Sequence, residues 1–156
     1  MSTTTSSIEQ AFQRCYAALK NSGTAAVNAR TTADALVRAE TDGQKGHGLS
    51  RVPSYAAQVR SGKVQGQATP QIVELKDGLF RVDAGFGFAY QAIKLALSEL
   101  APRTEKLGIA AAAIYHSHHF GVAGHPCEDL AKQGFIAFVY GNTPKAIATF
   151  GARQKV

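Results

Sequence analysis

Apolar residues recur every three or four positions through the first sixty residues, a spacing that places them on one face of a helix. Three helices are predicted here. The first begins after Ser7, which forms a capping-box pattern with the glutamine three residues later, and it ends at Gly23. The second spans about residues 24–42 and the third about residues 51–61. Together they predict an N-terminal helical segment over residues 1–65.

The hydrophobic pattern changes to alternation after residue 66. Residues 71–75 and 79–83 alternate apolar and polar side chains as strands do, and the Lys-Asp-Gly sequence between them is a hairpin turn signal. A longer helix is predicted over residues 89–106, where Pro102 should kink or break it. This region therefore predicts a hairpin followed by a helix.

Two apolar runs later in the chain predict strands that are buried on both faces. They cover residues 109–115 and 135–140, with a helix between them at about residues 126–132. This order of elements predicts an α/β fold in which N-terminal helices precede a mixed sheet with flanking helices. Residues 66–156 would begin an α/β substrate and cofactor domain. Because the turn-rich residues 143–156 lead to no further element, we expect an incomplete domain and a chain that is the front part of a larger protein.

Composition and charge narrow the class of protein. The chain has 156 residues, of which 45% are hydrophobic, and this suits a folded domain with a core. Its net charge is +6, but Lys and Arg are scattered and no stripe of aromatic residues accompanies them, so we predict no nucleic-acid partner. The lack of a long apolar run predicts no membrane partner. Two distant cysteines and no secretory signal pattern lead us to expect a cytoplasmic location.

Histidines gather in one short segment directly after a predicted buried strand. His116, His118 and His119 lie there, at a place where α/β proteins often bind ligands. A second candidate segment holds His47 between two glycines and Arg51 four residues later. Arginine can hold a carboxylate through two parallel hydrogen bonds, and histidine can move a proton near neutral pH. The two residues together suit a small oxo acid, although spacing alone favours a helix-start histidine and a surface arginine.

Other patterns give weaker chemical signals. The histidine cluster, with Cys127 nearby, is one candidate for metal binding, but no carboxylate completes a known ligand spacing, so no metal site is predicted. Gly85 and Gly87 resemble a dinucleotide fingerprint that lacks its third glycine, and we interpret them as a tight loop. Asn142 and Thr143 follow the last predicted strand, which is another position where ligands bind.

These segments together resemble the malate/L-lactate dehydrogenase family of the second type, which is unrelated to the Rossmann-type lactate dehydrogenases. The matching motifs occur in the family's order: Gly46-His47-Gly48 with Arg51, Asp83 to Gly87, Ser117 to Gly124, and Gly141-Asn142-Thr143-Pro144 with Phe150-Gly151. The resemblance implies an L-sulfolactate dehydrogenase-like, non-Rossmann fold and a homodimer. It also implies reversible hydride transfer between NAD(P)(H) and a small 2-oxo or 2-hydroxy acid, or a cyclic imine acid.

The resemblance also implies residue roles. His47 would give and take the proton, Arg51 would hold the substrate carboxylate, and His119 would face the substrate as a second histidine. The residues expected beside substrate or nicotinamide are His118, Asn142 and Thr143. Length is the main departure, since family members continue past residue 156. Two alternatives therefore stay open: a truncated, non-catalytic remnant that binds no dinucleotide, and a histidine-rich metal-binding domain.

Overall fold

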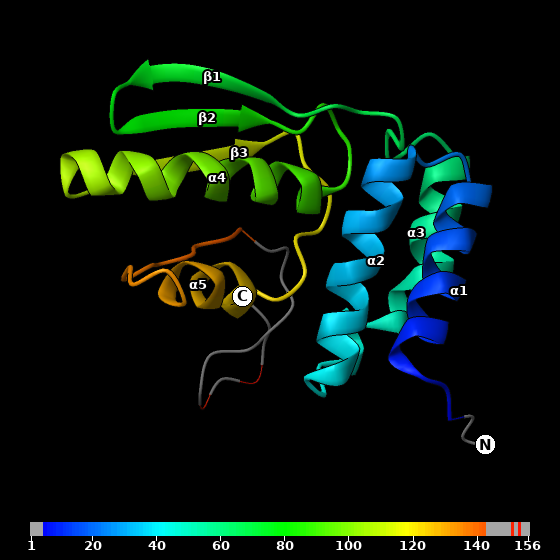
Figure 1. Ribbon diagram of the computed structural model, residues 1–156. Helices are drawn as coiled ribbons and strands as arrows, with labels where there is room; N and C mark the ends of the chain where they lie inside the picture. The colour runs from blue at the N-terminus through cyan, green and yellow to red at the C-terminus, as the bar shows by residue number, and fades with distance from the viewer. Residues whose placement is uncertain (1–4, 143–150, 152, 154–156) are drawn as a thin grey trace.

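Three helices form the N-terminal part of the fold and lie side by side at one end of the molecule (Figure 1). They are α1 (Ile8–Asn21), α2 (Ala26–Thr41) and α3 (Val52–Arg60). The computed structural model describes residues 5–142, 151 and 153. Ser7 caps α1, because its side chain accepts a hydrogen bond from the Gln10 N–H while the Gln10 side chain accepts one from the Ser7 N–H. The three predicted helices are confirmed.

A three-stranded mixed sheet forms the second part of the fold. Its strands are β1 (Gln71–Lys76), β2 (Leu79–Asp83) and β3 (Ala111–Tyr115), in the order β1-β2-β3. The β1 and β2 strands pair antiparallel as the predicted hairpin, whereas β2 and β3 pair parallel. Helix α4 (Ala89–Leu107) lies against one face of the sheet, and α5 (Gly124–Ala131) lies on the side of α4 that is away from the sheet (Figure 1). The predicted α/β fold with a mixed sheet is confirmed.

Pro102 does not break α4, since the helix continues through it to Leu107. A proline inside a helix leaves the carbonyl four residues earlier without its donor. Here that residue is Ser98, which is exposed, so water can hydrate the free carbonyl. The cost is offset because Ala92 and Ala96, on the opposite side of the helix, pack against the sheet.

The two runs predicted as fully buried strands behave differently. β3 forms, but only Ala112 and Ile114 pack into the cluster between sheet and α4, because α4 covers a single face of the sheet in the part of the chain described. The segment 135–140 is no strand, since no described neighbour pairs with it. Its Ile136 and Tyr140 side chains are 90% and 89% exposed. The prediction of a second buried strand is therefore wrong for the described structure.

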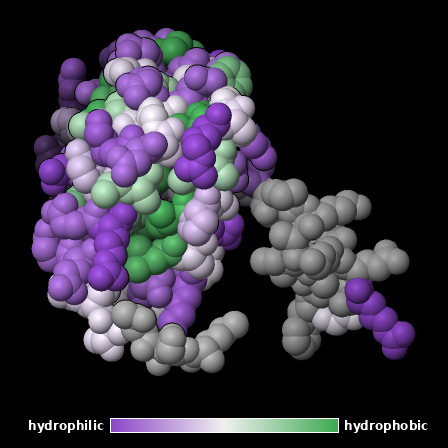
Figure 2. Space-filling model, turned by 90° about the vertical axis from the view of Figure 1, so that its right-hand side faces the viewer, coloured by the Kyte–Doolittle hydropathy of each residue, from purple (hydrophilic) through white to green (hydrophobic). Residues whose placement is uncertain are grey.

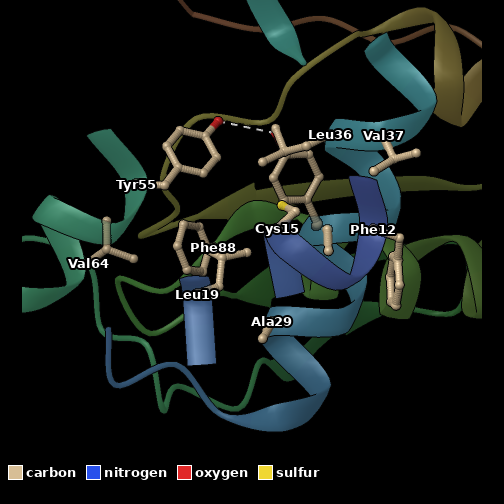
Figure 3. Close-up of a cluster of buried hydrophobic side chains, with 11 residues drawn as sticks. Phe12, Cys15, Leu19, Ala29, Leu36, Val37, Tyr55, Val64 and Phe88 are labelled. Atoms are coloured by element: carbon tan, nitrogen blue, oxygen red, sulfur yellow. Dashed lines mark hydrogen bonds between the residues drawn. The ribbon is translucent and has the colours of Figure 1, made fainter. Parts of the chain in front are cut away.

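Two clusters of buried side chains stabilise the molecule. The first joins the three N-terminal helices and includes Leu19, Leu36 and Tyr55 (Figure 3). The second lies between the sheet and α4 and includes Phe80 and Val82. The start of α4 links them, because residues there contribute to both clusters. The outer face at the helical end is mostly hydrophilic with a central hydrophobic area (Figure 2). No helix in residues 5–142 combines the length and the apolar character that a membrane span requires.

Candidate functional site

His47 lies in a tight turn between α2 and α3. Two short 3₁₀ turns, Lys45–His47 and Leu49–Arg51, carry the chain from one helix to the next. The Glu40 carboxylate of α2 accepts a hydrogen bond of 2.9 Å from the Leu49 N–H and so holds the second turn in place. Gly48 passes so close to Glu40 that an added Cβ would lie 3.1 Å from the Glu40 Cα. A side chain at this position would press against Glu40, which explains the glycine that follows His47.

The two candidate segments meet in space. The imidazole of His119, from the loop after β3, stacks on the imidazole of His47 with ring centroids 5.3 Å apart and an angle of 10° between the planes. The two residues are 72 positions apart in the sequence, and the α2–α3 turn and the β3 loop bring them together. This is the geometric core of the candidate site.

Hydrogen bonds hold the His119 ring in place. Its Nδ1 lies 2.9 Å from the Tyr55 hydroxyl oxygen of α3 and accepts a hydrogen bond of 3.2 Å from the Gly121 N–H. The Tyr55 hydroxyl in turn lies 3.2 Å from that of Tyr90. Burial lowers the pKa of His119, and the positive charges of Arg51 and His47 lower it further. Both effects favour the neutral imidazole of His119 over the charged one.

Arg51 brings positive charge to this site. Its Nε donates a hydrogen bond to the Gly46 carbonyl, and its Nη groups make no hydrogen bond or ion pair with any of residues 5–142. The positive charge of Arg51 contributes to the lowered pKa of both His118 and His119. A guanidinium tethered by Nε with the other nitrogens unengaged suits an anionic ligand.

His118 is tied into the wall of the site. Its Nε2 donates a hydrogen bond of 2.6 Å to the Gln58 side-chain carbonyl, and its ring meets those of Tyr55 and Phe88 edge to face. Its Nδ1 is buried and has no hydrogen-bond partner among the described residues. Burial, followed by the charges of His119, Lys63 and Arg51, lowers the pKa of His118 to about 4. The binding role predicted for His118 stays a prediction.

The lowered pKa of His118 predicts a loss of stability in acid. Between pH 6.5 and about 4 the unfolded chain protonates this histidine while the folded protein does not, so the free energy of unfolding falls as the pH falls through this window. We expect His118→Gln, which keeps a donor for Gln58 but cannot titrate, to lose less stability over that range. Urea unfolding at several pH values measures the difference. Parallel stability curves for the two proteins would contradict the prediction.

A cavity of about 330 Å³ opens beside His47, between α2, α4 and the segment that leads into α5. Apolar residues and several charged residues form its walls. The lining residues are Thr31, Asp34, Ala35, Arg38, Ala39, His47, Tyr90, Ile93, Lys94, Leu97, Phe120, Gly121, Val122, His125, Pro126 and Asp129. Among the residues described, the buried Nδ1 of His47 has no hydrogen-bond partner. A buried ring nitrogen without a hydrogen-bond partner is uncommon in folded proteins and is more often found at functional sites than in a packed core.

The other predicted residues lie outside this pair. His116 is exposed, stacks on Phe86 and contacts the Asp83 carboxylate 3.2 Å away. Asn142 is exposed. The residue before it, Gly141, packs closely on the cavity residue Phe120, since an added Cβ would lie 2.6 Å from a ring carbon, so Asn142 follows a residue that contacts the cavity wall. Thr143 lies outside the described residues. Within the described ranges no three His, Cys, Asp or Glu side chains are grouped to hold a metal ion.

Tyr55 is a residue of the site that no sequence motif reveals. The residue is 1% exposed and sits on the apolar face of α3, so its hydrophobic spacing alone predicts packing. A buried tyrosine hydroxyl, however, nearly always needs a hydrogen-bond partner. That requirement was the available signal, but only the fold shows that the partner is a histidine distant in the sequence.

Comparisons with known proteins show which family this chain resembles. The family profile described as malate/L-lactate dehydrogenase matches residues 6–156. A (2R)-3-sulfolactate dehydrogenase (NADP(+)) from Chromohalobacter salexigens is 44% identical over 148 residues, which is 95% of this chain and 44% of that protein.

Two solved structures show the same architecture. The delta1-piperideine-2-carboxylate reductase from Pseudomonas syringae pvar. tomato has a TM-score of 0.80 at 34% identity, over 85% of this chain and 40% of that one. The sulfolactate dehydrogenase from Methanocaldococcus jannaschii has a TM-score of 0.76 at 25% identity, over 81% of this chain and 37% of that one. The chain thus spans about two fifths of the length of these relatives. Matched along nearly all of its own length, it belongs to the malate/L-lactate dehydrogenase family.

Proposed function

We propose that this chain carries the proton-transfer and carboxylate-binding part of an NAD(P)-dependent oxidoreductase. The substrate would be a small 2-oxo or 2-hydroxy acid, or a cyclic imine acid. The observation that carries the proposal is the stacked His47–His119 pair, of which His47 lines the cavity. The positive charge of Arg51 acts on the same pair, since it lowers the pKa of His119. Relatives named for sulfolactate and for piperideine-2-carboxylate support the substrate class, because both compounds are small acids.

The size of the cavity bears on the cofactor. Its volume of about 330 Å³ lies at the lower end of the range usual for ligand pockets. This suits a small acid together with a nicotinamide ring and is too small for a whole dinucleotide. The described residues therefore fit the reacting end of NAD(P)(H), and His47 and Tyr90 would line its place. When bound, the reduced nicotinamide supplies the hydride.

Each residue at the site has a chemical task. Negative charge collects on the carbonyl oxygen as the carbon accepts the hydride, and His47 donates the proton that completes the alcohol. In the reverse direction His47 removes that proton. Arg51 holds the carboxylate, which fixes the carbonyl relative to the two imidazoles. In a cyclic imine acid the same proton goes to the imine nitrogen.

Further parts of the proposal rest on the family resemblance. Asn142 and Thr143 would contact substrate or nicotinamide, and His118 would help to form the binding site. The protein would act in the cytoplasm and would form a homodimer. Sedimentation of the purified protein measures its oligomeric state. The net charge of +6 favours the approach of an anionic substrate and of a phosphorylated cofactor.

Activity of the native gene product that carries this chain tests the proposal. We expect oxidation of NADH or NADPH with at least one of pyruvate, oxaloacetate, sulfopyruvate and piperideine-2-carboxylate. The loss of nicotinamide absorbance measures this oxidation. Calorimetric titration with each nucleotide is the parallel measurement. Absence of both turnover and nucleotide binding in a folded sample would favour the non-catalytic remnant, and bound metal in elemental analysis would favour the metal-binding alternative.

A further inference from the structure

We propose that Tyr55, supported by Tyr90, is a positioning residue that keeps the proton of His119 on Nε2. His119 would then meet the substrate as a neutral hydrogen-bond donor while His47 exchanges the proton. This inference rests on the proposed function for its chemical meaning. Its structural part, the position of one proton, stands on hydrogen bonds alone and can be measured without turnover.

The direction of the hydrogen bonds follows from one backbone group. The Gly121 N–H can only donate, and it points at His119 Nδ1 over 3.2 Å, so Nδ1 carries a lone pair and no proton. The Tyr55 hydroxyl, 2.9 Å from the same nitrogen, must therefore donate to it. Tyr55 has then used its hydrogen, and the Tyr90 hydroxyl, 3.2 Å away, must donate to the Tyr55 oxygen. One arrangement satisfies all three contacts, and it leaves the imidazole proton on Nε2.

Burial keeps this chain of hydroxyls protonated. Tyr55 is 1% and Tyr90 9% exposed. Burial raises the pKa of both hydroxyls, so neither loses its hydrogen near neutral pH. Gly121 completes the arrangement, because an added Cβ there would lie 2.9 Å from the Tyr90 hydroxyl oxygen and its φ of 76° favours glycine. The loop after β3 therefore packs closely on α4, which positions the Gly121 N–H.

The charged groups around His119 explain why this tautomer matters for the proposed reaction. Charged and titratable groups face the ring from several elements: His47 and Arg51 from the α2–α3 turn, Tyr55 from α3, and His118 from its own loop. Two positively charged imidazoles in a stack 5.3 Å apart beside Arg51 would repel one another. Donors at Nδ1 favour a neutral His119, so that His47 can hold the transferable proton. Nε2, which has no partner among residues 5–142, is left to donate to the substrate oxygen.

Nuclear magnetic resonance of the ring nitrogens tests the inference directly. In ¹⁵N-labelled native protein, two-bond proton–nitrogen correlations distinguish a protonated from an unprotonated ring nitrogen. We expect His119 to show Nδ1 unprotonated and Nε2 protonated at neutral pH. Tyr55→Phe removes the stronger donor to Nδ1, so part of the population should move its proton to Nδ1 and the pKa of His119 should rise. Tyr90→Phe should change both in the same direction by less, and Tyr16→Phe, a control tyrosine stacked on Phe12, should change neither.

The outcomes separate the two proposals. A wild-type His119 protonated on Nδ1, or a ring unchanged in both Tyr55→Phe and Tyr90→Phe, overturns the inference. The expected tautomer in a protein without any turnover overturns the proposed function and leaves the proton assignment standing. Where the enzyme turns over, Tyr55→Phe should lower kcat about tenfold and change KM little. This is far less than the roughly 10⁴-fold loss that follows a wrong histidine tautomer in a serine protease, because Gly121 still donates to Nδ1.

Discussion

His47→Ala is expected to lower kcat by about 10²- to 10⁴-fold with whichever acid the native protein reduces. The variant removes the only imidazole in the described structure that both lines the cavity beside the 3₁₀ turns and stacks on His119. Without it, the developing oxygen anion must take its proton from water. Steady-state oxidation of NADH or NADPH, measured with substrate at saturation, isolates this effect on kcat.

The matched control for this variant is His116→Ala. His116 is also a histidine of the β3 loop region, but it is exposed, contacts Asp83 and does not line the cavity. It should retain the wild-type kcat. Unchanged turnover in His47→Ala, or an equal loss in both variants, would remove His47 from its proposed role. Circular dichroism of both proteins checks that each remains folded.

Arg51→Ala is expected to raise KM for the acid by roughly 10- to 100-fold, since a hydrogen bond to a charged group contributes about 1.5–3 kcal/mol. Loss of the guanidinium also removes a positive charge that lowers the pKa of His119, so that pKa should rise in the variant. Arg51→Lys keeps the charge but not the two-pronged geometry, and it should recover only part of the affinity. Initial rates over a range of acid concentrations give KM for each protein.

Arg60→Ala is the matched control, because Arg60 is an exposed arginine at the last turn of α3, the helix that follows Arg51. Its KM should equal that of the wild type. An unchanged KM in Arg51→Ala would show that another group holds the carboxylate. A KM raised for uncharged analogues as much as for acids would instead indicate a general distortion of the turn.

Short-range sequence patterns predicted the N-terminal helices and the hairpin correctly. The serine and glutamine of the capping box define the start of α1, and the Lys-Asp-Gly turn defines the hairpin, because in both cases the interacting residues are close in sequence. Burial was predicted less well. The apolar run that becomes β3 does not indicate whether one or both faces of the strand are covered by other elements. Residues 135–140 cannot form a strand without a neighbouring strand to pair with. Both depend on partners distant in the chain.

The candidate site divides in the same way. The types of side chain, two imidazoles and a guanidinium, follow from motifs and from the family resemblance. Their convergence is visible only in three dimensions, where His47 and His119 stack. No sequence pattern predicts the hydrogen bonds that link Tyr90 and Tyr55 to His119, because these three residues are far apart in the chain.

The site also lies where two separately packed halves of the molecule meet. His47 is attached to the helical cluster, whereas His119 follows a strand of the sheet cluster, and α4 is shared between them. A ligand that contacts both imidazoles therefore acts as a cross-link between the halves. Because such a ligand binds only when both halves are folded and in contact, it stabilises that joined state against the unfolding of either half, and substrate at saturation should make the two halves melt together.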